Sequence, residues 1–154
     1  MAFREKDGAF LWQLTAPKLP GGDEVDWEYL GICSSTLIEG DRGYVMTNRG
    51  EVACLDLKGF SNGNQGFQEE GQYMVGPGKK GGKAGPTDAD ILWTYDMIKE
   101  LGVVPHNITS SSVALVGGKV VATTSNGINE DHDHIPSPKA PALIMLNATT
   151  GELE

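Results

Sequence analysis

The sequence repeats itself, and this internal similarity restricts the possible folds more than any other feature. Residues Ile32–Leu37 match Ile108–Val113, and residues Tyr44–Thr47 match Val120–Thr123. The two matches share one offset, because 108 minus 32 and 120 minus 44 are both 76. An ungapped offset that holds through two apolar stretches predicts two copies of one structural unit.

A second signature recurs three times along the chain. It consists of an Asp or Asn, a turn that contains Gly, and an apolar residue before Trp. The copies are Asp7–Trp12, Asp56–Gly59 resumed at Ile91–Trp93, and Asn147–Gly151 followed by Leu153. The third copy stops where its Trp is due. A repeat that places one Trp per unit therefore runs through the whole chain.

Short apolar runs separated by Gly, Asn and Asp turns predict strands in each unit. The predicted strands are residues 32–38, 43–47, 51–56 and 91–95 in the first unit, and residues 110–116, 119–124 and 143–147 in the second. Helix is nearly absent from the pattern. Residues 96–101, which are followed by Gly102, predict one or two helical turns.

Four short antiparallel strands per repeat, with a period near the roughly 40 to 45 residues of a propeller blade once inserts are removed, predict an all-β fold. We expect a partial β-propeller of about two four-stranded antiparallel blades with long loop inserts. Residues 1–154 are then a fragment of one propeller domain. Its expected parts are the end of an upstream blade (1–14), a blade with a loop insert at 60–90 (15–95), and a blade with an insert at 128–141 and a truncated last strand (96–154). Two blades leave apolar faces uncovered, so the chain is expected to be part of a larger protein or to self-associate.

The Asp, Gly, apolar, Trp signature, together with Ser125–Gly127 at the end of a strand, resembles the PQQ-like repeat of quinoprotein-type β-propellers. This superfamily includes pyrroloquinoline-quinone alcohol dehydrogenases and the propeller lipoprotein of the bacterial outer-membrane assembly machine. The segment from Asp88 to Glu154 looks most like uncharacterised extracytoplasmic members from planctomycete-type bacteria. The residues that carry this likeness are Tyr95–Met97, Glu100–Gly102, Pro105–Asn107 and Ile135–Pro138.

The resemblance implies a structural role for the repeated Trp. In that family, the Trp of each repeat docks between blades against a Gly-containing turn. Trp12 and Trp93 match these positions, and Gly59 and Gly151 match the surfaces on which such residues rest. A Trp covers a wide apolar area, and Gly allows it to approach the backbone closely.

The resemblance also gives the two alternatives for function. The first is a non-catalytic propeller segment for protein or ligand binding or scaffolding, with no catalytic residues and no cofactor. The second is part of a PQQ-dependent dehydrogenase, which would need PQQ, calcium and a disulfide of adjacent cysteines. Cys33 and Cys54 are 21 residues apart and are expected to be buried free thiols on strands one and three of one blade.

The net negative charge argues against nucleic acid as a partner. Twelve Lys and Arg against 21 Asp and Glu give a net charge of −9, and binding to nucleic acid needs a basic footprint instead. No apolar run reaches the roughly 20 residues of a membrane helix, and Met1–Phe10 is too polar for a signal peptide. The partners expected from the propeller architecture are other blades of the parent propeller and possibly another protein. A periplasmic or otherwise extracytoplasmic location is implied by the resemblance alone.

In a propeller, the loops that follow strands two and four lie on one face. Residues 15–31, 48–50, 96–107 and 126–141 would share it, and they contain all three histidines. His132 and His134 alternate with Asp131 and Asp133, a set of ligands suited to Zn or another divalent ion. Asp23, Glu24, Asp26 and Glu28 are expected on the same face. The alternative interpretation of the His–Asp run is a solvated acidic loop.

His106 and Asn107 stand just before a predicted first strand, where the central channel of a propeller opens, and Asn126 lies in a loop of the same face. These three residues are candidates for lining a ligand pocket. Equally, Pro105 fixes an extended entry to the strand and His106 serves only to satisfy nearby carbonyl groups.

Overall fold

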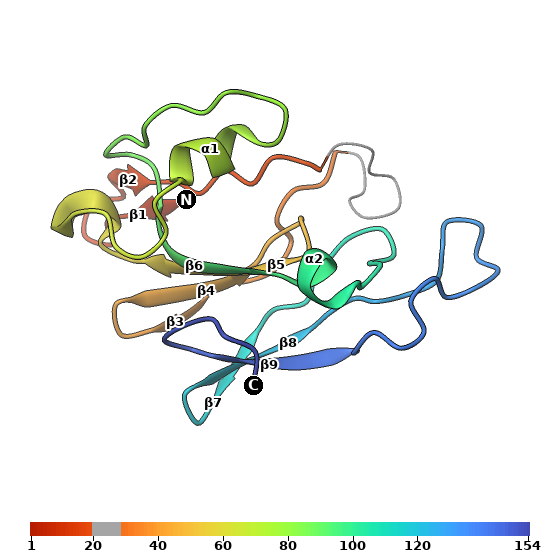
Figure 1. Cartoon of the computed structure of the whole chain (residues 1–154). Coiled ribbons are helices and arrows are strands. Elements are labelled where there is room, and N and C mark those ends of the chain that lie inside the picture. Colours follow the sequence, from red (N-terminus) through yellow and green to blue (C-terminus); the bar gives the residue numbers. More distant parts are fainter. Residues whose placement is uncertain (20–28) are drawn as a thin grey trace.

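The computed structural model describes residues 1–19 and 29–154, and in these residues it contains three antiparallel sheets (Figure 1). The chain is mostly β, as predicted. The first sheet pairs β1 (Ala2–Phe3) with β2 (Phe10–Trp12). The second has the order β3 (Leu37–Glu39), β4 (Arg42–Met46), β5 (Glu51–Asp56) and β6 (Asp90–Asp96). The third has the order β7 (Ala114–Val116), β8 (Lys119–Thr123) and β9 (Leu143–Asn147).

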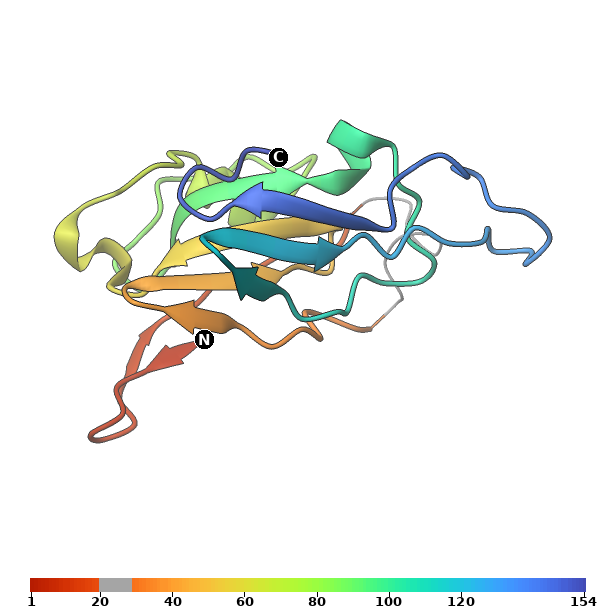
Figure 2. The same cartoon turned by 90° about the horizontal axis from the view of Figure 1, so that it is seen from below.

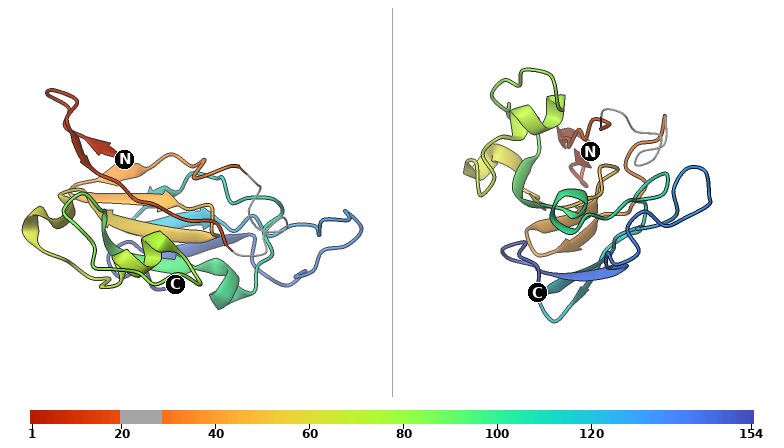
Figure 3. Two further views of the ribbon diagram at one scale, coloured as in Figure 1. Left: turned by 90° about the horizontal axis from the view of Figure 1, so that it is seen from above. Right: turned by 45° about the vertical axis from the view of Figure 1, so that its right-hand side comes forward.

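The four-stranded sheet is the middle layer. The N-terminal hairpin lies on one of its faces and the three-stranded sheet on the other (Figures 1 and 3). All six residues of β5 are buried because apolar side chains point into a core on each face. Val52 and Cys54 pack towards the three-stranded sheet, whereas Ala53 and Leu55 pack towards the hairpin.

The first strand of each repeat is shorter than the sequence predicted. Strands over 32–38 and 110–116 were expected, but β3 begins at Leu37 and β7 at Ala114. The serines in the preceding segments form hydrogen bonds through their side chains instead of a ladder. Ser34 Oγ donates to the carbonyl of Met46 at 2.6 Å, and Ser112 Oγ accepts from the backbone N–H of Ser35 at 2.9 Å. The two matching segments of the repeat thus contact each other.

The first insert is more ordered than the sequence predicted. The segment 60–90 was expected to be a long loop, but it contains a 3-10 helix, η1 (Gly59–Asn62), and the helix α1 (Glu70–Val75). Its glycines permit close packing of backbone on backbone, because a Cβ at Gly71 would lie 1.9 Å from the carbonyl oxygen of Gly82. The Gln72 side chain accepts from Gly81 N–H and donates to the carbonyls of Gly76 and Lys79, which fixes this loop to α1.

The short helix α2 (Met97–Leu101) forms where one or two helical turns were expected. Asp96 caps its N-terminus by accepting a hydrogen bond from Lys99 N–H, and Gly102 ends it in the left-handed conformation. The insert 128–141 has no strand or helix and extends beyond the end of the sheets (Figure 2).

The second unit has three strands rather than four, and an isolated bridge between Leu146 and Leu153 follows β9. Within residues 1–19 and 29–154, no sheet closes on itself. In the same residues, every helix is too short to cross a membrane.

Candidate functional sites

Trp93 joins the four-stranded sheet to the three-stranded sheet. It projects from β6, is buried, and lies on Gly151 in the turn after β9. A Cβ at Gly151 would lie 2.6 Å from Cδ2 of the indole ring, so only glycine fits there. The indole Nε1–H donates to the carbonyl of Ala148 at 3.3 Å. Tyr44 Oη also donates to this carbonyl, at 3.2 Å, so one turn satisfies two aromatic side chains.

Trp12 makes the same arrangement one sheet earlier. It projects from β2 of the N-terminal hairpin and lies on Gly59, where a Cβ would lie 2.7 Å from the ring atom Cδ1. Its Nε1–H donates to the carbonyl of Leu57 at 3.2 Å. Two consecutive pairs of sheets are therefore joined by one constellation: an indole on a glycine of positive φ, with its N–H bonded two or three residues before that glycine.

The loops that carry the predicted ligand residues lie at one end of the sheets. Residues 48–50, 96–107 and 126–141 are found together there (Figure 2). Gly50 connects two of them, because its carbonyl accepts from Met97 N–H at 3.0 Å and a Cβ at Gly50 would lie 2.9 Å from the Ile98 side chain. The acidic residues Asp23, Glu24, Asp26 and Glu28, which were expected on the same face, lie outside the described residues.

Asn126 holds these loops together through its amide group. Its Oδ1 accepts from Val104 N–H at 2.9 Å, and its Nδ2 donates to the carbonyl of Ser137 at 2.9 Å. Residue 126 also forms a β-bridge with Pro105. Both ends of the Asn126 amide therefore form hydrogen bonds between loops. Asn107, by contrast, adopts a φ of +66°, which few non-glycine residues do.

The two histidines predicted as metal ligands have different partners. Nε2 of His132 lies 3.1 Å from Nε2 of His106, on the other loop. Nδ1 of His134 lies 2.6 Å from Oδ1 of Asp133, a hydrogen bond that lowers the pKa of this carboxyl. Asp131 is exposed. In the described parts of the chain, no group of three or more His, Cys, Asp or Glu side chains is placed to hold a metal ion together.

The two cysteines have different environments, and the prediction that both are buried is wrong for Cys33. Cys33 is exposed because β3 begins only at Leu37, so residue 33 lies outside the sheet. Cys54 is buried in β5, and this burial raises the pKa of its thiol to about 12. Both are free thiols.

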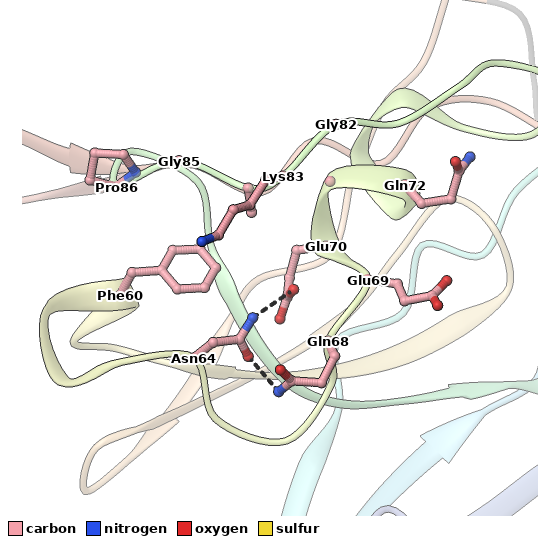
Figure 4. Close-up of a pocket in the computed structure, with 12 residues that line it drawn as sticks. Phe60, Asn64, Gln68, Glu69, Glu70, Gln72, Gly82, Lys83, Gly85 and Pro86 are labelled. Atoms are coloured by element: carbon pink, nitrogen blue, oxygen red, sulfur yellow. Dashed lines mark hydrogen bonds between the residues drawn. The ribbon is translucent and has the colours of Figure 1, made fainter.

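A cavity of about 660 Å³ lies over the insert between η1 and α1, and the sequence did not indicate it (Figure 4). Glu70, at the start of α1, is only 1% exposed. Its Oε2 accepts from Asn64 Nδ2 at 3.0 Å, and Gln68 Nε2 in turn donates to Asn64 Oδ1 at 2.8 Å. Among the described residues, Oε1 of Glu70 has no hydrogen-bond partner. Lys83 lines the cavity from the glycine-rich segment.

Asp90, at the start of β6, is a second buried carboxyl and interacts electrostatically with Glu70. It is 0% exposed, and both of its carboxyl oxygens lie 3.2 Å from Gln65 N–H, which donates to them. Burial raises its pKa to about 6, the Gln65 hydrogen bond opposes this shift, and the nearby carboxyls of Glu70 and Asp56 add to it. The buried carboxyls of Glu70 and Asp90 thus lie close enough to interact, and of these two only Glu70 lines the cavity.

We expect Asp90→Asn to stabilise the protein at pH 7. Because the carboxyl pKa is raised from the usual value of about 3.9 to about 6, the folded state binds this proton more tightly than the unfolded state. The stability of the parent protein should fall as the pH rises through this window, and Asp90→Asn should remove that fall, adding about 1 to 2 kcal/mol at pH 7. Denaturation at a series of pH values measures this.

The control is Asp131→Asn, an exposed carboxyl in the other insert. We expect it to change stability by less than about 0.5 kcal/mol. A direct NMR titration of the Asp90 carboxyl carbon should have its midpoint near pH 6. A midpoint near pH 4, or equal effects of the two substitutions, would contradict this description of the buried Asp90 carboxyl.

Comparison with known proteins adds no family. No protein-family model matches the chain, and no curated protein matches it at a significant level. The fold and the sites define the chain at the level of class: an all-β protein of stacked antiparallel sheets, joined by tryptophans that lie on glycine turns.

Proposed function

We propose that this chain is a segment of a PQQ-like β-propeller that acts, without catalysis, as a binding scaffold. The observation that best supports the proposal is the repeated contact of Trp12 with Gly59 and of Trp93 with Gly151 between consecutive sheets. In this proposal each sheet is one blade, residues 1–14 end an upstream blade, and residues 15–95 and 96–154 form the next two. An extracytoplasmic location belongs to the proposal through the resemblance, as does the relation to the outer-membrane assembly propeller.

An uncovered apolar face on the three-stranded sheet supports this proposal. Along β9, Ile144 and Leu146 are buried against the middle sheet, whereas Leu143 and Met145 point away from it and are 58% and 37% exposed. Val116 of β7 is 59% exposed. Exposed apolar faces of this kind mark contact surfaces, and a further blade is the occupant that the repeat predicts.

The opposite end of the stack also has uncovered apolar groups. Phe3 and Phe10 of the N-terminal hairpin pack edge to face with ring centroids 5.8 Å apart, yet are 53% and 44% exposed. A mostly apolar cavity of about 680 Å³ lies beside Trp12, lined in part by Val45 and Leu55. This is where the remaining strands of an upstream blade would pack.

The uncovered face can be tested through self-association. When residues 1–154 are produced alone, we expect them to self-associate in a concentration-dependent manner in sedimentation velocity. The double variant Val116→Lys/Met145→Lys should be monomeric at the same concentrations and should keep its thermal stability, because both side chains are exposed.

Ile135→Lys is the matched control, since Ile135 is 51% exposed but lies in the insert 128–141 rather than on the sheet. We expect this variant to associate like the parent. A parent chain that stays monomeric at all concentrations, or a control that abolishes association as fully as the double variant, would contradict the proposal that this face is a docking surface.

A further inference from the structure

We propose that His106 and His132 together bind a divalent transition-metal ion of the zinc and copper class through their Nε2 atoms. The two Nε2 atoms lie 3.1 Å apart, and the rings meet edge to face with centroids 4.8 Å apart. Two imidazole nitrogens at about 2.0 to 2.1 Å from one tetrahedral metal ion are separated by roughly 3.3 Å. The pair is thus within a few tenths of an ångström of a chelating geometry.

The structure fixes the His106 side through close packing. His106 N–H donates to the carbonyl of Ser125 at 3.3 Å, and the preceding Pro105 is buried and paired with Asn126. A Cβ at Gly127 would lie 2.9 Å from Cβ of His106, so the glycine makes room for this side chain. The imidazole is only partly exposed, and its position depends on two adjoining loops.

The His132 side is fixed by a tight turn around Asn129. His132 N–H donates to the carbonyl of Asn129 at 3.1 Å, and the Asn129 side chain accepts from the N–H groups of Asp133 and His134 at 3.1 and 3.2 Å. His132 adopts a φ of +57°. Few non-glycine residues adopt such a conformation, and here it belongs to the turn that places the His132 ring beside His106.

Coordination of a metal ion would stabilise this pair of imidazoles more than the hydrogen bond between them does. A single hydrogen bond between two solvent-exposed rings contributes little net stability, because water competes for both nitrogens. Neutral imidazoles are good ligands for zinc and copper, and an exposed pair leaves the other coordination positions open to water. The surrounding loop carries the carboxylates Glu130, Asp131 and Asp133, and the net charge of −9 also favours a cation.

This site differs from the one expected from sequence spacing, in which His132 was combined with His134. It uses His106 from before β7 and His132 from the β8–β9 insert, so its ligands lie 26 residues apart. His134 bonds to Asp133 instead. The inference does not depend on whether the sheets are propeller blades.

Zinc binding to the metal-free chain tests the proposal by isothermal titration calorimetry. We expect saturable binding of one Zn²⁺ per chain. His106→Ala and His132→Ala should each weaken it at least tenfold, because each removes one of two protein ligands. His134→Ala is the matched control, an exposed histidine of the same insert, and it should change the affinity less than twofold.

Equal losses in all three variants, or full affinity in His106→Ala, would overturn the proposal, as would the absence of saturable binding in the parent. Histidine side-chain NMR of the unmodified chain gives a second test that does not require any variant to fold. Zn²⁺ should shift the Nε2 signals of His106 and His132 and leave those of His134 in place. Shifts confined to His132 and His134 would instead support the pair predicted from spacing.

Discussion

Trp93→Ala is expected to lower the free energy of unfolding by about 3 to 5 kcal/mol, the usual cost of truncating a buried aromatic residue. The indole fills the space between the four-stranded and three-stranded sheets and contacts Tyr44, with ring centroids 6.1 Å apart. Its removal leaves a cavity and also leaves the carbonyl of Ala148 without one of its donors. Urea denaturation followed by circular dichroism measures the change.

Trp93→Phe separates the two contributions. Phenylalanine keeps most of the apolar contact but cannot donate to Ala148, so we expect a loss smaller than that of alanine, with the hydrogen bond accounting for about 0.5 to 1.5 kcal/mol of it. A loss below about 1 kcal/mol for Trp93→Ala would show that the indole does not join the two sheets, because truncating a well-packed aromatic side chain lowers the free energy of unfolding by more than that.

Gly151→Ala is the second substitution for which we expect a large effect. Gly151 has a φ of +76°, and the new Cβ would lie 2.6 Å from the Trp93 ring. Positive φ costs an L-residue roughly 1 to 2 kcal/mol, and forcing the indole aside adds about 1 to 3 kcal/mol. Chemical denaturation under the conditions used for Trp93→Ala gives the sum of these two terms.

Gly118→Ala isolates the contact with the indole. Gly118 has the same φ of +76°, but nothing lies within 4 Å of the position of its Cβ. This substitution therefore carries the conformational cost alone, and Gly151→Ala should be more destabilising by the packing term. Equal losses in the two variants would mean that Trp93 does not rest on Gly151.

The strands were predictable where turn residues and apolar alternation agree. β5 and β9 begin and end where expected. β5 follows Gly50 and ends at Asp56, whereas β9 follows Pro141 by one residue and ends at Asn147. The Ser-rich starts of the two units were wrongly predicted as strands. Their apolar spacing resembles a strand, but their hydroxyls bond outside the ladder, as Ser34 and Ser112 show.

The insert 60–90 could not be derived from its glycines. A glycine-rich segment usually reads as loop, yet here the glycines permit the close approach of Gly71 to Gly82 that packs the segment on α1. The proximity of Glu70 to Asp90 depends on this path, because the two residues approach each other only once the insert folds back over the sheet. Sequence spacing carries no signal for such a meeting.

The positions of Trp12, Trp93, Gly59 and Gly151 came from the recurring signature, and their contacts were implied by the family resemblance. The partner of His132 had no such signal. It depends on how the insert 128–141 turns around Asn129, a local hydrogen-bonding arrangement that no periodicity records. Spacing therefore indicated His134, and the structure places His106 there instead.

The central claim is that each sheet is fixed to the next by an indole lying on a glycine turn, and proton NMR of the intact chain tests this most directly. We predict nuclear Overhauser effects from the Trp93 ring to the Gly151 α-protons and from the Trp12 ring to the Gly59 α-protons, with both glycine signals shifted by the ring current. Glycine α-protons at ordinary shifts, without contacts to either indole, would contradict the account.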